Sequence, residues 1–119
     1  MKYAIQIHSG PSRPHAAHTA YRFILAALAA GHEVTRVFFH QDGVYHAMIF
    51  PNRNSGTDWP TLARSHGIDL VLCISAAARR GLCDEEGNGA TPSPGFRLGG
   101  LGLWMEACSQ SDRLLVFGD

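Results

Sequence analysis

The chain has 119 residues, 45% hydrophobic and 17% charged, a composition typical of one globular domain that spans residues 1–119. Ten basic residues balance ten acidic ones, which argues against direct nucleic-acid binding because such proteins need a basic patch to neutralise phosphates. No stretch of about 20 apolar residues could span a bilayer, and Met1-Lys2 leads directly into a strand-like segment without a signal peptide.

The first part of the chain predicts a strand, a helix and a second strand. Residues 2–8 alternate apolar and polar side chains and predict the first strand, which a turn-rich loop follows. Apolar residues at helical spacing predict a helix over about 15–30, and Gly31 is well placed to end it in the left-handed conformation. The aromatic and β-branched segment 33–39 predicts the second strand, with a turn or short helix over 41–47 after it.

The middle of the chain predicts a helix and a buried strand. An exposed loop is expected at 51–57, and Asp58 is placed to cap a helix that runs to His66. The apolar run 68–74 is too short for a helix and predicts a buried strand. Ser75 is then placed to cap the helix that follows this strand.

The last part of the chain completes an alternation of strands and helices. A Gly-, Pro- and acid-rich loop over 84–95 precedes a candidate fifth strand near 96–98. Apolar residues at i, i+3 and i+7 predict a helix over 101–108, and 113–117 supplies the last strand. We therefore predict an α/β fold, a single-domain three-layer βαβ arrangement with a mainly parallel sheet of four or five strands.

Cys73 is the most informative residue for function. It lies where a predicted strand meets a helix, near unpaired backbone N–H groups that favour the reactive thiolate. Chemistry in open parallel sheets gathers outside the carboxyl ends of the strands, where His8 and His40 could face the same crevice as Cys73. A cysteine in an apolar strand is also commonly a small buried hydrophobe, so the spacing leaves both interpretations open.

The other candidate residues surround this cysteine in the sequence. Arg79 and Arg80 could raise the positive potential at Cys73, or they could be a solvated helix end. Cys83 could form a disulfide with Cys73, whereas Cys108 fits an apolar helix face. Three cysteines without a CxxC motif fit neither a disulfide framework nor a zinc ribbon and indicate a reducing cytoplasm, and the seven histidines follow no metal-ligand spacing.

Three ordered stretches carry a resemblance to a known family. They are the segment 31–47 with its Gly43-Val44-Tyr45, the segment Cys73-Ile74-Ser75-Ala76-Ala77-Ala78-Arg79-Arg80-Gly81, and Leu98 to Leu103 with Glu106-Ala107 and Asp112-Arg113 leading into Val116-Phe117. Across nearly its whole length the chain resembles the DsrE-type sulfur-relay family, and within it the TusD-like subunits. Cys73 corresponds to the sulfur-carrying cysteine of that family, whereas Cys83 matches no family cysteine.

The resemblance implies a cytoplasmic sulfurtransferase subunit without cofactor or metal. Its partners would be TusB-like and TusC-like subunits in a heterohexamer, a TusA-like sulfur donor and a TusE-like acceptor. Cys73 would carry sulfur as a persulfide, with Arg79 and Arg80 as support for its thiolate, and the sulfur would end in 2-thiouridine of tRNA. Alternatives are a DsrE-type subunit of dissimilatory sulfur oxidation, a non-catalytic subunit, and a dithiol redox protein that uses Cys73 and Cys83.

Overall fold

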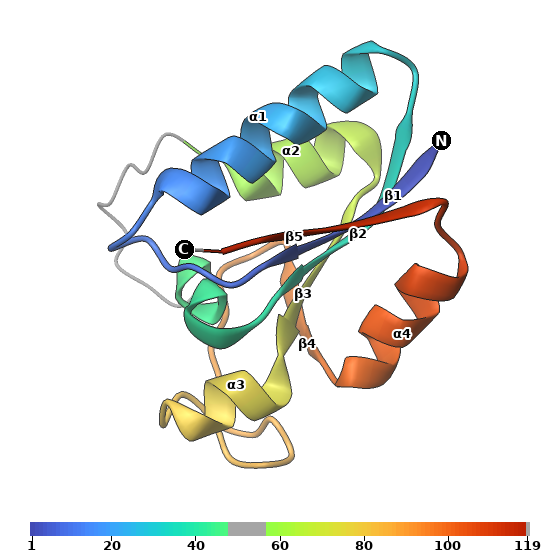
Figure 1. The fold of residues 1–119 in the computed structure, drawn as a ribbon. Coiled ribbons are helices and arrows are strands. Elements are labelled where there is room, and N and C mark those ends of the chain that lie inside the picture. The colour runs from blue at the N-terminus through green and yellow to red at the C-terminus, as the bar shows by residue number, and fades with distance from the viewer. Residues whose placement is uncertain (48–56, 119) are drawn as a thin grey trace.

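A parallel sheet of five strands, in the order β4-β3-β2-β1-β5, forms the centre of the fold. The computed structural model describes residues 1–47 and 57–118 (Figure 1). The elements along the chain are β1 (Lys2–Ile7), α1 (His15–Ala29), β2 (Glu33–Phe39), the 3-10 helix η1 (Gln41–His46), α2 (Trp59–His66), β3 (Asp69–Cys73), α3 (Ile74–Arg79), β4 (Phe96–Gly99), α4 (Leu101–Ser109) and β5 (Arg113–Phe117).

Helices cover both faces of this sheet. Figure 1 shows α1 and α2 on one face and α4 on the other, with α3 and η1 at the edge where the strands end. The predicted α/β fold of three layers is therefore confirmed, and the candidate strand near 96–98 is present as β4. Segment 51–57, expected to be a loop, lies outside the described residues except for Thr57.

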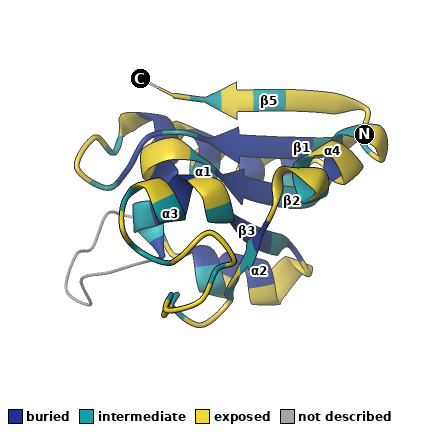
Figure 2. Ribbon diagram, turned by 90° about the horizontal axis from the view of Figure 1, so that it is seen from below, coloured by how far each residue is buried: buried dark blue, intermediate teal, exposed yellow. Residues whose placement is uncertain are grey.

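The core is built on the three inner strands. Figure 2 shows β1, β2 and β3 as largely buried and β5 as largely exposed. Ile5, Phe38 and Leu72, one from each inner strand, are 0% exposed. Such burial on both faces explains why β3 is a nearly continuous apolar run in the sequence.

The helix ends follow the turn chemistry that the sequence predicts, with one exception. Asp58 accepts a hydrogen bond from the N–H of Thr61 at 3.2 Å, as a capping residue should. Gly31 (φ +88°) and Gly67 (φ +67°) take the left-handed conformation just after α1 and α2. Within residues 1–47 and 57–118, no helix is long and apolar enough to cross a bilayer.

The predicted cap of α3 is wrong. The helix begins at Ile74, two residues earlier than expected, and Cys73 occupies the N-cap position in place of Ser75. Sγ of Cys73 accepts the N–H of Ala76 at 3.5 Å, which supplies the partner that a serine hydroxyl would otherwise give. The correction makes the thiol itself part of the helix start.

Candidate active site

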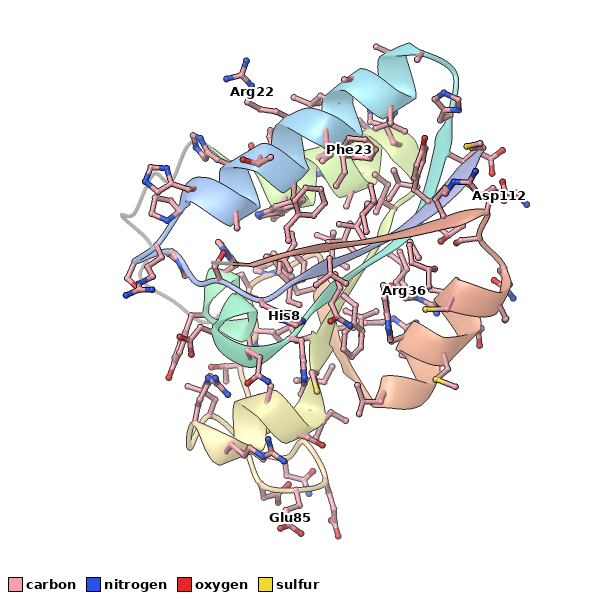
Figure 3. All side chains as sticks on the ribbon, viewed as in Figure 1. His8, Arg22, Phe23, Arg36, Glu85 and Asp112 are labelled. Carbon is pink, nitrogen blue, oxygen red and sulfur yellow. The ribbon has the colours of Figure 1, made fainter. Side chains whose placement is uncertain are left out.

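Three chemically active side chains end three neighbouring strands. Ile7 of β1 is paired with Phe39 of β2, and Phe39 is paired with Leu72 of β3. The residues that follow them, His8, His40 and Cys73, therefore form a row across the carboxyl edge of the sheet. Figure 3 shows His8 on the side of the sheet where η1 and α3 lie. The structure thus brings together the histidines and the cysteine that the strand ends predict.

His40 and Cys73 lie on the same face of the sheet. The ring of Phe38 lies 6.2 Å from that of His40 and 6.0 Å from that of Trp104 in α4, so Phe38 and His40 face α4. Val71 is paired with Phe38, which places Cys73, two residues later, on this face as well. The backbone is extended at both His40 (φ −123°, ψ 164°) and Cys73 (φ −68°, ψ 118°), so the alternation of side chains continues to both residues.

Cys73 is 0% exposed and belongs to the hydrophobic core. Its burial agrees with the usual behaviour of a free cysteine in an apolar strand. Cys73 nevertheless lies at the carboxyl end of β3, and its Sγ accepts a hydrogen bond from the Ala76 N–H, the kind of partner that favours a thiolate. Any partner that reacts with Cys73 must therefore reach it through a local opening of the surrounding structure.

The two histidines at this edge are held as a pair. Their ring centroids lie 5.4 Å apart, with the planes at 70°. Nε2 of His8 is hydrogen-bonded to Oε1 of Gln6. Burial lowers the pKa of both histidines, and the positive charges of Arg80 and Arg79, together with His8, lower the pKa of His40 further. Both imidazoles are therefore neutral at pH 7.

Arg80 ties α3 to η1. Its Nε donates to Oδ1 of Asp42 at 2.9 Å, its Nη2 to Oε1 of Gln41 at 3.4 Å and its Nη1 to the carbonyl of Ala76 at 3.1 Å. Arg79 is exposed. Both arginines lie in the part of the fold that covers Cys73, and their support of the thiolate stays a prediction.

Arg80→Met is expected to make Cys73 more accessible. Because the substitution removes the hydrogen bonds between α3 and η1, we expect it to cost about 1 kcal/mol of local stability, since the Asp42 partner is largely exposed. Alkylation of Cys73 by a small electrophile should then be about fivefold faster. Arg79→Met is the matched control, and an equal acceleration in both variants would contradict the structural role of Arg80.

The other two cysteines are free thiols with different surroundings. Burial and the neighbouring Asp84 raise the pKa of Cys83, and burial raises the pKa of Cys108. Both are therefore thiols rather than thiolates at pH 7, which weakens them as nucleophiles. The Sγ–H of Cys83 lies 3.9 Å from the carbonyl of Ile74, so Cys83 packs beside the start of α3. The structure therefore leaves the dithiol alternative open to experiment.

Gly43 lies where η1 approaches the end of β1, a close contact that the sequence motif does not reveal. Its N–H donates to the carbonyl of His40 at 2.9 Å. A Cβ at position 43 would overlap the carbonyl oxygen of Ile7, which accepts the N–H of His40 at 2.9 Å. Only glycine therefore allows η1 to pack against the strand ends and to anchor the backbone of His40. The sequence shows this glycine within its Gly-Val-Tyr segment, but it does not show the strand against which the glycine lies.

Acidification is expected to destabilise the fold. Nε2–H of His46 donates a hydrogen bond to the carbonyl of Ser9 at 2.9 Å, and burial lowers the pKa of His46 below the usual 6.5, as it does for His8 and His40. Because the unfolded histidines bind protons first, stability should be lost as the pH falls below about 6.5 and through the lower folded pKa values. Thermal unfolding between pH 7.5 and 5 measures this. A His46→Gln variant should show a shallower slope, and an unchanged slope would contradict the assignment.

In the part of the chain that the structure describes, no group of three or more His, Cys, Asp or Glu side chains is arranged to hold a metal ion. The site itself holds one buried thiol, two imidazoles with lowered pKa values and a helix start. This combination suits nucleophilic attack by sulfur.

Comparisons with known proteins find relatives over the whole length of the chain. A model of the DsrE/DsrF-like family matches residues 1–117. The chain is 45% identical to the DsrE protein of Allochromatium vinosum over 100% of both chains. It is 44% identical to the "Sulfurtransferase TusD homolog" of Pseudomonas aeruginosa, over 99% of this chain and 98% of the relative. It is 38% identical to the "Sulfurtransferase TusD" of Salmonella paratyphi B, over 98% and 100%. The crystal structure of the ychN protein from E. coli has the same fold, with a TM-score of 0.74 at 15% identity over 98% of this chain and 100% of the other.

Proposed function

The chain belongs to the DsrE/DsrF-like family, and on that premise we propose that it accepts sulfane sulfur as a persulfide on Cys73 and relays it to an acceptor protein. The wider conclusion, that the chain is a sulfurtransferase, follows from its full-length relatives of that name at 38% to 44% identity. The observation that carries the proposal is the hydrogen bond from the Ala76 N–H to Sγ of Cys73, at the carboxyl end of an inner strand.

The proposed reaction is two successive exchanges at sulfur. The Cys73 thiolate attacks the outer sulfur of a persulfide on the donor, a new S–S bond forms, and the donor sulfur leaves with the electron pair of the broken S–S bond. The acceptor thiolate then attacks the outer sulfur on Cys73, and Cys73 leaves as a thiolate. The proton on the outer sulfur moves with that sulfur, and neither exchange consumes an external oxidant or reductant.

The residues around Cys73 support each exchange. The N–H of Ala76 stabilises negative charge on Sγ, both when Cys73 attacks and when it leaves. Arg79 and Arg80 add positive potential in the same region under this proposal. Burial shelters the persulfide from oxidants and small thiols. The element best suited to open for a partner is α3, because a helix of six residues has little stability of its own.

The proposal extends to partner proteins. Four large apolar side chains on α4 and β5 are exposed: Leu101 at 50%, Met105 at 68%, Leu114 at 49% and Val116 at 56%. Exposed apolar side chains that gather on one part of a surface are typical of protein–protein interfaces. This exposure supports association with TusB-like and TusC-like subunits in a heterohexamer. We propose a TusA-like donor, a TusE-like acceptor and 2-thiouridine in tRNA as the end of the relay in a reducing cytoplasm. A DsrE-type role in sulfur oxidation is the second candidate, supported by the 45% identity to the DsrE protein.

Intact mass measurement separates this relay from a dithiol redox protein. After incubation with a persulfide donor, a sulfur carrier gains one sulfur atom. After treatment with a mild oxidant, a dithiol protein loses two hydrogens because a bond forms between Cys73 and Cys83. A chain that forms this disulfide and takes up no sulfur, alone or in its complex, would contradict the relay. Loss of tRNA 2-thiouridine in cells that lack the chain would then favour the first pathway over the second.

A further inference from the structure

One buried nitrogen atom at the strand end next to that of Cys73 lacks a hydrogen-bond partner. Three buried side-chain N or O atoms in residues 1–47 and 57–118 make no hydrogen bond: Ser9 Oγ, His40 Nδ1 and Trp59 Nε1. A buried polar atom without a partner is destabilising, and in a native protein it calls for an explanation such as a catalytic role or an absent ligand. Of the three, the nitrogen of His40 belongs to the row of side chains that contains Cys73.

The structure places His40 and Cys73 at the ends of two adjacent strands. His40 and Cys73 follow the paired residues Phe39 and Leu72 and share the face of the sheet toward α4, on strands about 4.8 Å apart. The backbone of His40 is held on both sides, since its N–H donates to the Ile7 carbonyl and its own carbonyl accepts from Gly43, each at 2.9 Å. The rings of Phe38 and His8 pack against its imidazole. The unpartnered Nδ1 is therefore held in place at this edge of the sheet.

A persulfide on Cys73 would extend Sγ by one S–S bond of about 2.05 Å, at the same edge and on the same face of the sheet as His40. Building on the proposed carrier role of Cys73, we propose that Nδ1–H of His40 donates a hydrogen bond to the outer sulfur of the Cys73 persulfide. His40 is thus a catalytic residue that holds the transferred atom, and the unpartnered nitrogen of the sulfur-free chain gains its partner when sulfur is loaded.

The electrostatics of the site fit this role. Burial and the charges of Arg79 and Arg80 lower the pKa of His40, so its neutral ring carries a single N–H. Because Nε2 of His8 is already hydrogen-bonded to Gln6, His8 serves as a packing partner of His40 and not as a second donor. When the loaded persulfide is ionised, before its outer sulfur is protonated for transfer, an N–H donated to that sulfur forms a charge-assisted hydrogen bond, which is stronger than one between neutral groups.

Two amide substitutions test which nitrogen acts. The side-chain nitrogen of His40→Asn reaches the position of Nδ1, whereas that of His40→Gln reaches the position of Nε2. Each variant is loaded with a persulfide donor, and the half-life of sulfur on Cys73 is followed by mass spectrometry in a fixed concentration of a small thiol. We expect His40→Asn to stay near the wild type and His40→Gln to lose its sulfur about tenfold faster. His66→Gln, on the exposed end of α2, is the control and should match the wild type.

The outcomes separate this inference from the proposed function. Wild-type uptake on Cys73 is measured first, and its absence in both the chain and its complex would overturn the carrier role and this inference together. Uptake with equal sulfur half-lives in the wild type and His40→Gln would overturn the role of His40 alone. Equal losses in His40→Asn and His40→Gln would show that Nδ1 is not the donor. Thermal unfolding of all variants checks that the compared proteins are folded.

Discussion

Cys73→Ser is expected to abolish sulfur uptake and to leave the fold in place. A hydroxyl is close in size to the thiol and can accept the same N–H from Ala76, so α3 keeps its cap. Because a serine at this position is no nucleophile toward sulfane sulfur, the rate of uptake should fall by at least about a thousandfold. The free energy of unfolding should change by about 1–2 kcal/mol, because a buried hydroxyl replaces sulfur. Stopped incubations with a persulfide donor measure the rate, and urea unfolding measures the stability.

The other two cysteines provide matched controls for this variant. Cys83→Ser and Cys108→Ser should take up sulfur at the wild-type rate, because the pKa of each thiol is raised. Wild-type uptake by Cys73→Ser would place the sulfur on another thiol and refute the carrier role. Loss of uptake in Cys83→Ser would instead favour a reaction that needs both Cys73 and Cys83.

Gly43→Ala is expected to cost about 3 kcal/mol of stability, at the upper end of the range for overpacked positions. The added methyl group would overlap the backbone carbonyl of Ile7, which has no flexible end that could move away. Relief requires η1 to shift and the anchor of His40 to loosen, since Gly43 donates to the His40 carbonyl. Urea unfolding measures the loss, and sulfur uptake should fall with it because the row of site residues is disturbed.

Gly102→Ala supplies the control for this substitution. Gly102 lies in α4, and a Cβ at this position would meet no atom within 4 Å. Alanine should therefore stabilise the protein by about 0.5–1 kcal/mol through its higher helix propensity. If both alanine variants lowered stability equally, the close approach of Gly43 to β1 would not be the cause.

Much of the architecture follows from local patterns in the sequence. Short apolar runs such as 68–74 predict buried strands, and the glycines at 31 and 67 mark helix ends. Both features depend on residues that are close together in the sequence, so local patterns are enough to predict them. The strand β4 is the weakest of these predictions, since four residues give little periodicity. The position of Cys73 at the end of a strand is likewise visible in the sequence.

The arrangement of the site depends on contacts that the sequence does not display. The row of His8, His40 and Cys73 needs the strand order β3-β2-β1 and its register, which join residues far apart in the chain. The pairing of Arg80 with Asp42 spans 38 residues. The expectation that Ser75 caps α3 fails because Cys73 caps the helix two residues earlier, with its sulfur accepting the N–H of Ala76, and propensities for hydroxyl caps do not include that case.

The most direct test of the carrier role is to locate the transferred sulfur. The wild-type chain, alone and assembled with its partner subunits, is incubated with a persulfide donor and digested, and its peptides are weighed by mass spectrometry. If Cys73 carries the sulfur, we expect one added sulfur atom on the peptide that contains Cys73. Sulfur found only on the peptides of Cys83 or Cys108, or on no peptide in either the chain or the complex, would contradict it.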